Sequence, residues 1–135
     1  MDGVPKKSLI AYCIVDEQSN TTLVDQKLVS FFCKEFPEQK YSVKFASQDC
    51  ELRTCGSKVS GFNVRGIFQD EIIPIPDALS CSNIADTSNE VATPSIVRSH
   101  KHTAQYARFF PDYEPKAEMM ILIGRNCGRL WRLNV

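Results

Sequence analysis

The chain has 135 residues, 43% of them hydrophobic and 24% charged, which excludes general disorder and is enough for one domain with a core of its own. Sixteen Lys and Arg residues balance sixteen Asp and Glu residues, so bulk charge does not point to nucleic acid or an anionic membrane as a partner. No apolar run approaches the roughly 18 residues that a membrane-spanning helix needs, and the polar N-terminus lacks the apolar core of a signal peptide. We therefore expect a single domain over residues 1–135 that is intracellular and cytoplasmic and binds neither nucleic acid nor membrane.

The N-terminal part predicts a strand, an acidic turn and a short amphipathic segment. Residues 8–15 (SLIAYCIV) are apolar and rich in β-branched and aromatic side chains, which is typical of a buried strand. The run ends at a polar turn, residues 16–20 (DEQSN). Residues 23–32 mix Leu, Val and Phe with Asp, Gln and Lys, which indicates a short helix or an irregular amphipathic segment that closes before Pro37.

The middle of the chain predicts further short strands. Residues 41–46 (YSVKFA) alternate apolar and polar side chains, as a half-buried strand does, and residues 52–55 predict another strand. Glycines at positions 56, 61 and 66 suggest hairpins with tight bends over residues 56–66. Two prolines limit residues 72–75 to a short or edge strand.

The last third predicts a loop, some helical turns and one central strand. Residues 85–94 read as a loop, and residues 96–110 predict one or two short helical turns. Residues 118–124 (EMMILIG) form the most apolar run and predict a central strand. The final residues, 125–135, contain the apolar side chains Leu130, Trp131, Leu133 and Val135. The elements together predict a mainly β domain.

The cysteines and histidines give no clear metal or disulfide framework. Six cysteines are spread along the chain without a CxxC pair, so we expect them to be mostly reduced and mostly buried: Cys13, Cys33, Cys50, Cys55, Cys81 and Cys127. A bridge between Cys50 and Cys55 is the alternative in an oxidising setting. His100 and His102 form an HxH pair on a polar stretch, which favours surface residues over metal ligands. We expect neither a metal nor a cofactor.

Two motifs carry chemistry when they are taken together. The first is the apolar strand that runs into Asp16, in the sequence IVDEQSN of residues 14–20. The second is ILIGRN, residues 121–126, about a hundred residues later. An apolar-apolar-Asp turn followed at this separation by an apolar-Gly-Arg-Asn strand end resembles the two signatures of the retropepsins.

A wider stretch of the chain is similar to one branch of that group. The segments IVDEQSNTTLV, IPIPDALSCSNI, VATPSIV and FFPDYEPKAEMMILIGRN resemble the peptidase-like segment of Bel/Pao-type LTR retrotransposon polyproteins, over roughly residues 8 to 134. The resemblance implies a retropepsin-like closed barrel, the acid protease fold, with one or two short helices.

The resemblance assigns a role to each residue of the two motifs. Asp16 falls at the catalytic aspartate, and Glu17, Gln18 and Ser19 complete the active-site turn. Supporting positions fall at Ile123 and Gly124, which match the apolar-Gly pair behind that turn, and at Arg125 and Asn126, which open the last short helix.

Such a site implies a homodimer that cleaves a peptide or polyprotein substrate. Two carboxylates that share one proton activate the attacking water, and this chain has one such Asp turn, so the second Asp must come from a second subunit. By analogy, residues 56–66 are the flap that covers the substrate. We expect the dimer to form through the Asp16 turn and the termini, where pairing would bury the apolar C-terminal side chains.

The active-site turn departs from the family pattern at three positions. Glu17 replaces a Thr or Ser, Gln18 replaces a Gly, and Asn20 stands where many retropepsins have an Asp that pairs with the Arg of the second motif, here Arg125. Two alternatives therefore stay open: a catalytically impaired or domesticated module of the same fold that serves dimerisation or peptide binding, and a monomeric peptide-binding β domain.

Overall fold

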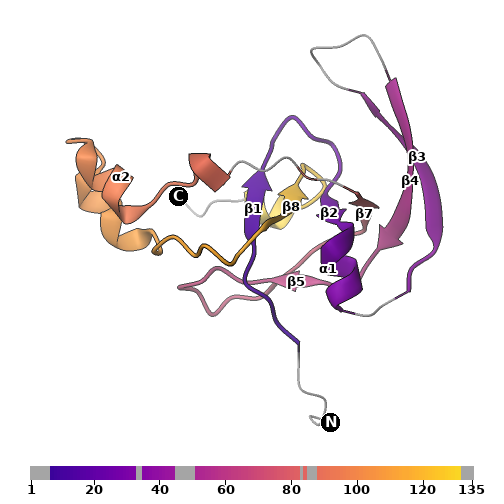
Figure 1. The fold of residues 1–135 in the computed structure, drawn as a ribbon, viewed down its shortest axis with the longest axis horizontal. Coiled ribbons are helices and arrows are strands. Elements are labelled where there is room, and N and C mark those ends of the chain that lie inside the picture. Colours follow the sequence, from indigo (N-terminus) through magenta and orange to yellow (C-terminus); the bar gives the residue numbers. More distant parts are fainter. Residues whose placement is uncertain (1–6, 33–34, 45–50, 83, 85–87, 132–135) are drawn as a thin grey trace.

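A computed structural model describes residues 7–32, 35–44, 51–82, 84 and 88–131. These residues form a mainly β structure built on one mixed sheet with a few short helices (Figure 1). The apolar C-terminal residues Leu133 and Val135 and the side chains of Leu130 and Trp131 lie outside the described part, so the prediction of pairing termini is not tested there.

Six strands form the main sheet in the order β1-β8-β2-β7-β4-β3. Their bounds are Tyr12–Val15 (β1), Met119–Ile123 (β8), Leu23–Asp25 (β2), Ala78–Cys81 (β7), Glu51–Val59 (β4) and Glu38–Lys44 (β3). Strand β8 runs parallel to β1 and antiparallel to β2, and β2 runs parallel to β7. The β7–β4 and β4–β3 pairs are antiparallel. A separate two-stranded ribbon joins β5 (Asn63–Val64) to β6 (Ile73–Pro74).

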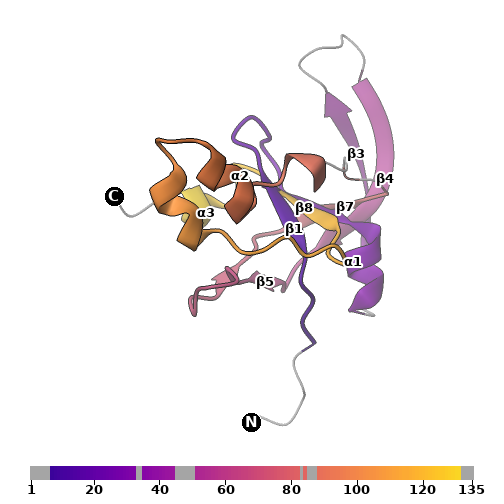
Figure 2. The same cartoon turned by 60° about the vertical axis from the view of Figure 1, so that its left-hand side comes forward.

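The main sheet is open in the part of the chain that the structure describes. Its order is linear from β1 to β3, and no pairing joins these two strands. Figures 1 and 2 show the β3–β4 ribbon standing out from the body on the side away from α2. The closed barrel implied by the resemblance is therefore not seen among the described residues.

The helices are short. The three α-helices of the described residues are α1 (Gln26–Phe31), α2 (Pro94–Ser99) and α3 (Gly128–Trp131), and two 3-10 turns are η1 (Ser88–Glu90) and η2 (Ala104–Phe109). Helix α1 begins at once after β2 because the Asp25 carboxylate accepts a hydrogen bond from the Lys27 backbone amide, at 2.8 Å, and so caps it. The segment 23–32 is thus part strand and part helix, and the helical turns predicted over residues 96–110 are present.

The core lies between α1 and the centre of the sheet. Strand β8 is almost wholly buried, as predicted for the most apolar run. The main cluster joins β2, β8, β7 and the end of β4 to α1 and to residues that flank the β5–β6 ribbon: Val24, Leu28, Val29, Val59, Phe62, Ile75, Ala78, Met120, Ile121, Ile123 and Cys127. Phe32 contacts Phe62 in this region with ring centroids 4.9 Å apart.

Strand β1 differs from its prediction as a buried strand. It pairs only with β8 and is an edge of the described sheet, so Cys13 and Val15 are exposed while Tyr12 and Ile14 are half-buried. Val15 is 56% exposed. An apolar run does not reveal whether a strand has one neighbour or two, because that depends on the order of strands in the sheet.

Gly56 lies inside β4 and not at a turn. A Cβ on Gly56 would run into the backbone carbonyl of Ser80 on β7, and the Tyr41 hydroxyl donates a hydrogen bond to that carbonyl at 2.7 Å. Desolvation raises the pKa of Tyr41, and the neighbouring Cys81 thiol adds to this rise. The glycine at this position therefore allows β4 to approach β7 closely.

The described cysteines are mostly not buried. Of the four that the structure describes, Cys13 and Cys55 are exposed, Cys81 is intermediate and only Cys127 is buried. The expectation of mostly buried cysteines is wrong for these four, because Cys13 and Cys55 lie on strands near the sheet edges. Cys33 and Cys50 lie outside the described residues. Within the described part, no helix is both long enough and apolar enough to cross a bilayer.

Candidate active site

Asp16 is the first residue after β1, and the sheet fixes its backbone. Its amide donates a hydrogen bond to the Ile123 carbonyl at 3.0 Å, which continues the β1–β8 ladder by one residue. Its Oδ1 accepts a hydrogen bond from the Gln18 amide at 3.0 Å, and its carbonyl accepts one from the Ser19 amide at 3.3 Å. The Asp16 turn, residues 16–19, is therefore closed by local hydrogen bonds around a half-buried carboxylate.

Gly124 lies directly behind the chain that leaves this turn. A Cβ at position 124 would stand 2.5 Å from the Thr21 carbonyl oxygen and 2.9 Å from the Ser19 carbonyl oxygen. The Arg125 amide donates to the same Ser19 oxygen at 2.8 Å. Val15 pairs with Ile123 in parallel register, so the two strand ends lie side by side, as expected from an apolar-Gly pair behind the turn. The two sequence motifs are thus one structural unit, and a glycine is needed where they meet.

Thr22 ties the two motifs to a third strand. Its side chain is fully buried, its Oγ1 donates to the Asn126 amide oxygen at 2.7 Å, and it accepts a hydrogen bond from the Gly124 amide at 3.1 Å. The Asn126 Nδ2 then donates to the Asp77 carbonyl at 3.1 Å, just before β7. Sequence reasoning missed Thr22 and Asp77. No local pattern in the sequence marks either residue, because the partner of each, Asn126, lies 104 residues from Thr22 and 49 residues from Asp77.

The side chains that depart from the family pattern face solvent. Glu17, Gln18 and Asn20 are exposed, and Glu17 forms no ion pair with a described residue. Arg125 is also exposed, and the hydrogen bond that joins it to the turn comes from its backbone and ends on Ser19. The two long side chains that follow Asp16 are therefore placed at the open surface of the site.

The long β3–β4 hairpin does not coincide with residues 56–66, which were expected to form the flap. It consists of β3 and β4, whereas residues 56–66 run from the end of β4 through a turn into β5. Gly61 takes a positive φ of 80° at that turn, which glycine adopts without strain. The prediction that residues 56–66 form one covering hairpin is wrong, because Gly56 serves strand packing instead.

The histidine pair does not complete a metal site. His100 and His102 are exposed, with ring centroids 6.3 Å apart. Among the described residues, no cluster of three or more His, Cys, Asp or Glu side chains is arranged to hold a metal ion.

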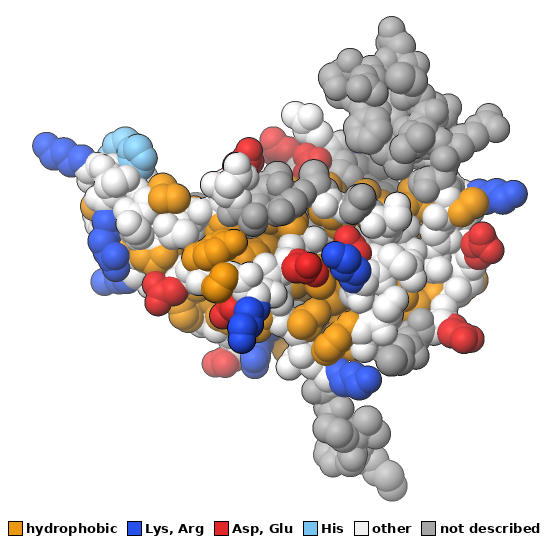
Figure 3. All heavy atoms as spheres, in the orientation of Figure 1, with side chains coloured by type: hydrophobic (Ala, Val, Ile, Leu, Met, Phe, Trp, Pro, Cys, Tyr) orange, Lys and Arg blue, Asp and Glu red, His pale blue; other side chains and the backbone are white. Residues whose placement is uncertain are grey.

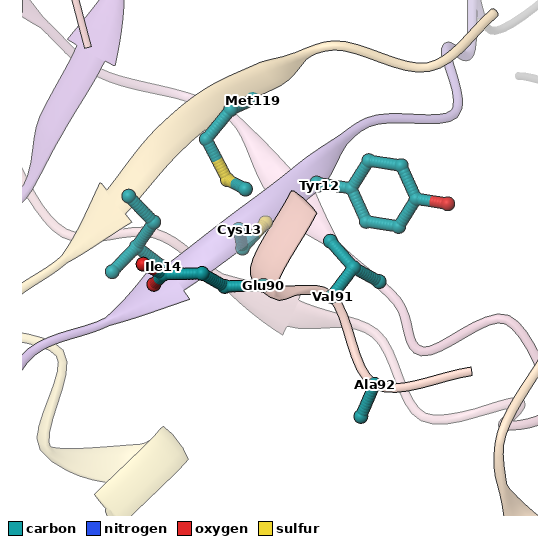
Figure 4. A pocket seen from close by; sticks show the side chains of 7 residues that line it. All are labelled: Tyr12, Cys13, Ile14, Glu90, Val91, Ala92 and Met119. Atoms are coloured by element: carbon teal, nitrogen blue, oxygen red, sulfur yellow. The ribbon is translucent and has the colours of Figure 1, made fainter. Parts of the chain in front are cut away.

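A shallow pocket of about 290 Å³ lies beside β1, and Asp16 is not among the residues that line it. Figure 4 shows the Glu90 side chain, at the end of η1, reaching toward Ile14 and Cys13 of β1, and Val91 lying beside Tyr12. Desolvation by these walls raises the pKa of the Cys13 thiol to about 11, although the residue keeps part of its surface in solvent. A raised thiol pKa lowers the share of reactive thiolate at neutral pH, which argues against a nucleophilic role for Cys13.

Comparison with protein families, curated proteins and solved structures finds no match to this chain.

Proposed function

We propose that this chain is a retropepsin-like aspartic endopeptidase domain of a retroelement polyprotein that acts as a homodimer. One observation carries the proposal. The strand that ends in Asp16 pairs in parallel with the strand that ends in Gly124, and the turn after Asp16 packs on that glycine. The resemblance requires this relation between two motifs about a hundred residues apart, and local turn chemistry alone does not produce it.

The proposed chemistry uses the Asp16 carboxylate as half of a shared site. Its Oδ1 is occupied by the Gln18 amide, whereas Oδ2 makes no hydrogen bond with a described residue. In the proposed dimer, two Asp16 side chains hold one water and one proton between them, so that one carboxylate acts as base and the other as acid. The substrate would be the parent polyprotein, in the cytoplasm. In an assay, peptide cleavage is expected to be faster at acidic pH than at neutral pH.

Exposed apolar surface next to Asp16 supports self-association. Val15 precedes Asp16 directly and is 56% exposed at an open sheet edge. A second copy placed with its own Asp16 against this turn would cover that side chain, which is a favourable burial of apolar surface. The retropepsin fold and the dimer both belong to the proposal, since the described sheet is open.

The second candidate is a module that keeps the fold without cleavage and serves dimerisation or peptide binding. Glu17 and Gln18 favour it, because two copies of Glu17 near a shared axis repel and Gln18 carries a side chain where the family has none. An Asp that accepts a hydrogen bond from the amide two residues on is also an ordinary turn former.

Three proteins separate these candidates: the natural chain, Asp16→Asn, and a double variant with Glu17→Thr and Gln18→Gly. Each is assayed for peptide cleavage between acidic and neutral pH, and sedimentation equilibrium establishes its assembly state. The proposal predicts that the natural chain dimerises and cleaves, and that Asp16→Asn dimerises without cleaving. Cleavage by the double variant alone would establish the non-catalytic module for the natural sequence, and a strict monomer would leave the monomeric peptide-binding domain.

A further inference from the structure

The segment of α2 and η2 projects from the sheet as a small unit of its own. Pro94, Val97 and Ala107 are buried within it, but none of them belongs to the main core cluster. The Thr103 hydroxyl donates to the Val97 carbonyl at 2.9 Å and so fastens the two turns together. Figure 1 shows this unit on the far side of β1 from the β3–β4 ribbon. Its surface is therefore held in one shape by contacts inside the unit.

This unit carries basic side chains without acidic ones. Residues 91–111 contain three Lys or Arg residues and no Asp or Glu, whereas the rest of the chain has thirteen Lys or Arg residues against sixteen Asp or Glu residues. Arg98, Lys101 and Arg108 are all exposed, and none forms an ion pair with a described residue. Figure 3 shows Lys, Arg and His side chains gathered at this end of the molecule. The net charge of zero for the whole chain therefore does not reveal that this unit has a cationic surface.

Exposed aromatic rings lie among these cations. Tyr106 is 48% exposed and Phe109 is 61% exposed, in a unit that buries only small apolar side chains. The Arg108 guanidinium lies over the Phe109 ring, 4.8 Å from its centroid. We call Arg98, Lys101, Tyr106, Arg108 and Phe109 the basic–aromatic surface.

We propose that the basic–aromatic surface binds single-stranded nucleic acid. Its three cations suit backbone phosphates, and its exposed rings offer faces on which unpaired bases stack without regard to sequence. An anionic membrane would favour a continuous apolar face, but here the cation Arg108 lies between the two rings along η2. An acidic peptide would use the charges and leave the two rings without a role. The expectation of no nucleic-acid partner rested on bulk charge, which does not report that this unit has basic side chains and no acidic ones.

The test measures fluorescence anisotropy of a short labelled oligouridylate with the whole chain over a range of salt concentrations. Three phosphate contacts predict a slope of log affinity against log salt of about −2, at about 0.7 per contact for single strands. Exchanging Arg98, Lys101 and Arg108 together for Gln is expected to weaken binding by at least about tenfold and to flatten the slope.

The matched control removes three exposed positive charges elsewhere, with Lys7, Lys40 and Arg65 exchanged for Gln. It changes net charge by the same amount and is expected to bind nearly as the natural chain does. For the rings, Tyr106→Ala and Phe109→Ala are each expected to weaken binding by about tenfold, and Phe68→Ala, which removes another exposed ring, by little.

Circular dichroism and thermal unfolding establish that each variant is folded before its affinity is used. Equal losses in the two triple variants would overturn the proposal, since bulk charge would then suffice. Binding that does not depend on Tyr106 and Phe109 would overturn it as well. Tighter binding to phosphatidylserine vesicles or to polyglutamate than to oligouridylate or oligothymidylate would assign the surface to a different partner.

Discussion

Replacing Gly124 by Ala puts a methyl group into space that the chain after Asp16 already fills. The new Cβ would lie 2.5 Å from the Thr21 carbonyl oxygen, 2.6 Å from the Thr21 carbonyl carbon and 2.9 Å from the Ser19 carbonyl oxygen. All three are backbone atoms, which cannot swing aside as the end of a long side chain can. We therefore expect a loss of unfolding free energy at the upper end of the over-packing range, about 3 kcal/mol.

Urea denaturation of the natural chain and two alanine variants measures this effect. The matched control is Gly128→Ala, because a Cβ at that position in α3 meets nothing within 4 Å. Alanine is more favourable than glycine in a helix by about 0.5–1 kcal/mol, so the control is expected to be neutral or slightly stabilised. If Gly124→Ala unfolds at the same urea concentration as the natural chain, the close packing of the Asp16 turn on β8 is refuted.

Further effects follow from other contacts in the structure. Thr22→Val removes a buried hydroxyl that both gives and receives a hydrogen bond, and is expected to lower unfolding free energy by about 1–3 kcal/mol; an unchanged urea midpoint would contradict its bridging role. Tyr41→Phe removes one hydrogen bond, to the Ser80 carbonyl, and is expected to cost about 1 kcal/mol by the same method. The Cys13 pKa of about 11, against an ordinary 9.0, predicts that iodoacetamide labels this thiol about 100-fold more slowly than a free thiol at pH 8, as measured by mass spectrometry. Because the folded pKa is raised, Cys13 also favours the folded state below pH 9, and this contribution is lost as pH rises toward 11.

The mainly β class and the central strand were predictable because local pattern determines them. Residues 119–123 are apolar at every position, and only a strand or helix with both faces covered hides such a run. The edge position of β1 was not predictable in this way, because residues 12–15 are equally apolar and what differs is the number of neighbouring strands. Gly56 likewise suggested a turn, but its reason lies in the approach of Ser80 from another strand.

In the candidate site, too, some features could be predicted from the sequence, whereas others depend on contacts between distant segments. The Asp16 turn and Gly124 could be placed together because a two-motif signature joins segments that are far apart in sequence. The hydrogen bond from Thr22 to Asn126 spans 104 residues, and the one from Asn126 to Asp77 spans 49 residues. No local pattern marks such partners, since threonine and asparagine are common in turns for unrelated reasons.

A subunit-mixing experiment tests most directly whether two Asp16 carboxylates form one catalytic site. The natural chain is mixed with Asp16→Asn at increasing ratios and constant total concentration, allowed to exchange subunits, and assayed for peptide cleavage at acidic pH. If each site needs one Asp16 from each subunit, an equal mixture retains about one quarter of the activity, because only about one dimer in four then has two intact subunits. If the equal mixture instead retains one half of the activity, in proportion to the natural chain, each subunit works alone and the shared aspartate site is contradicted. Full cleavage by Asp16→Asn alone would contradict it as well.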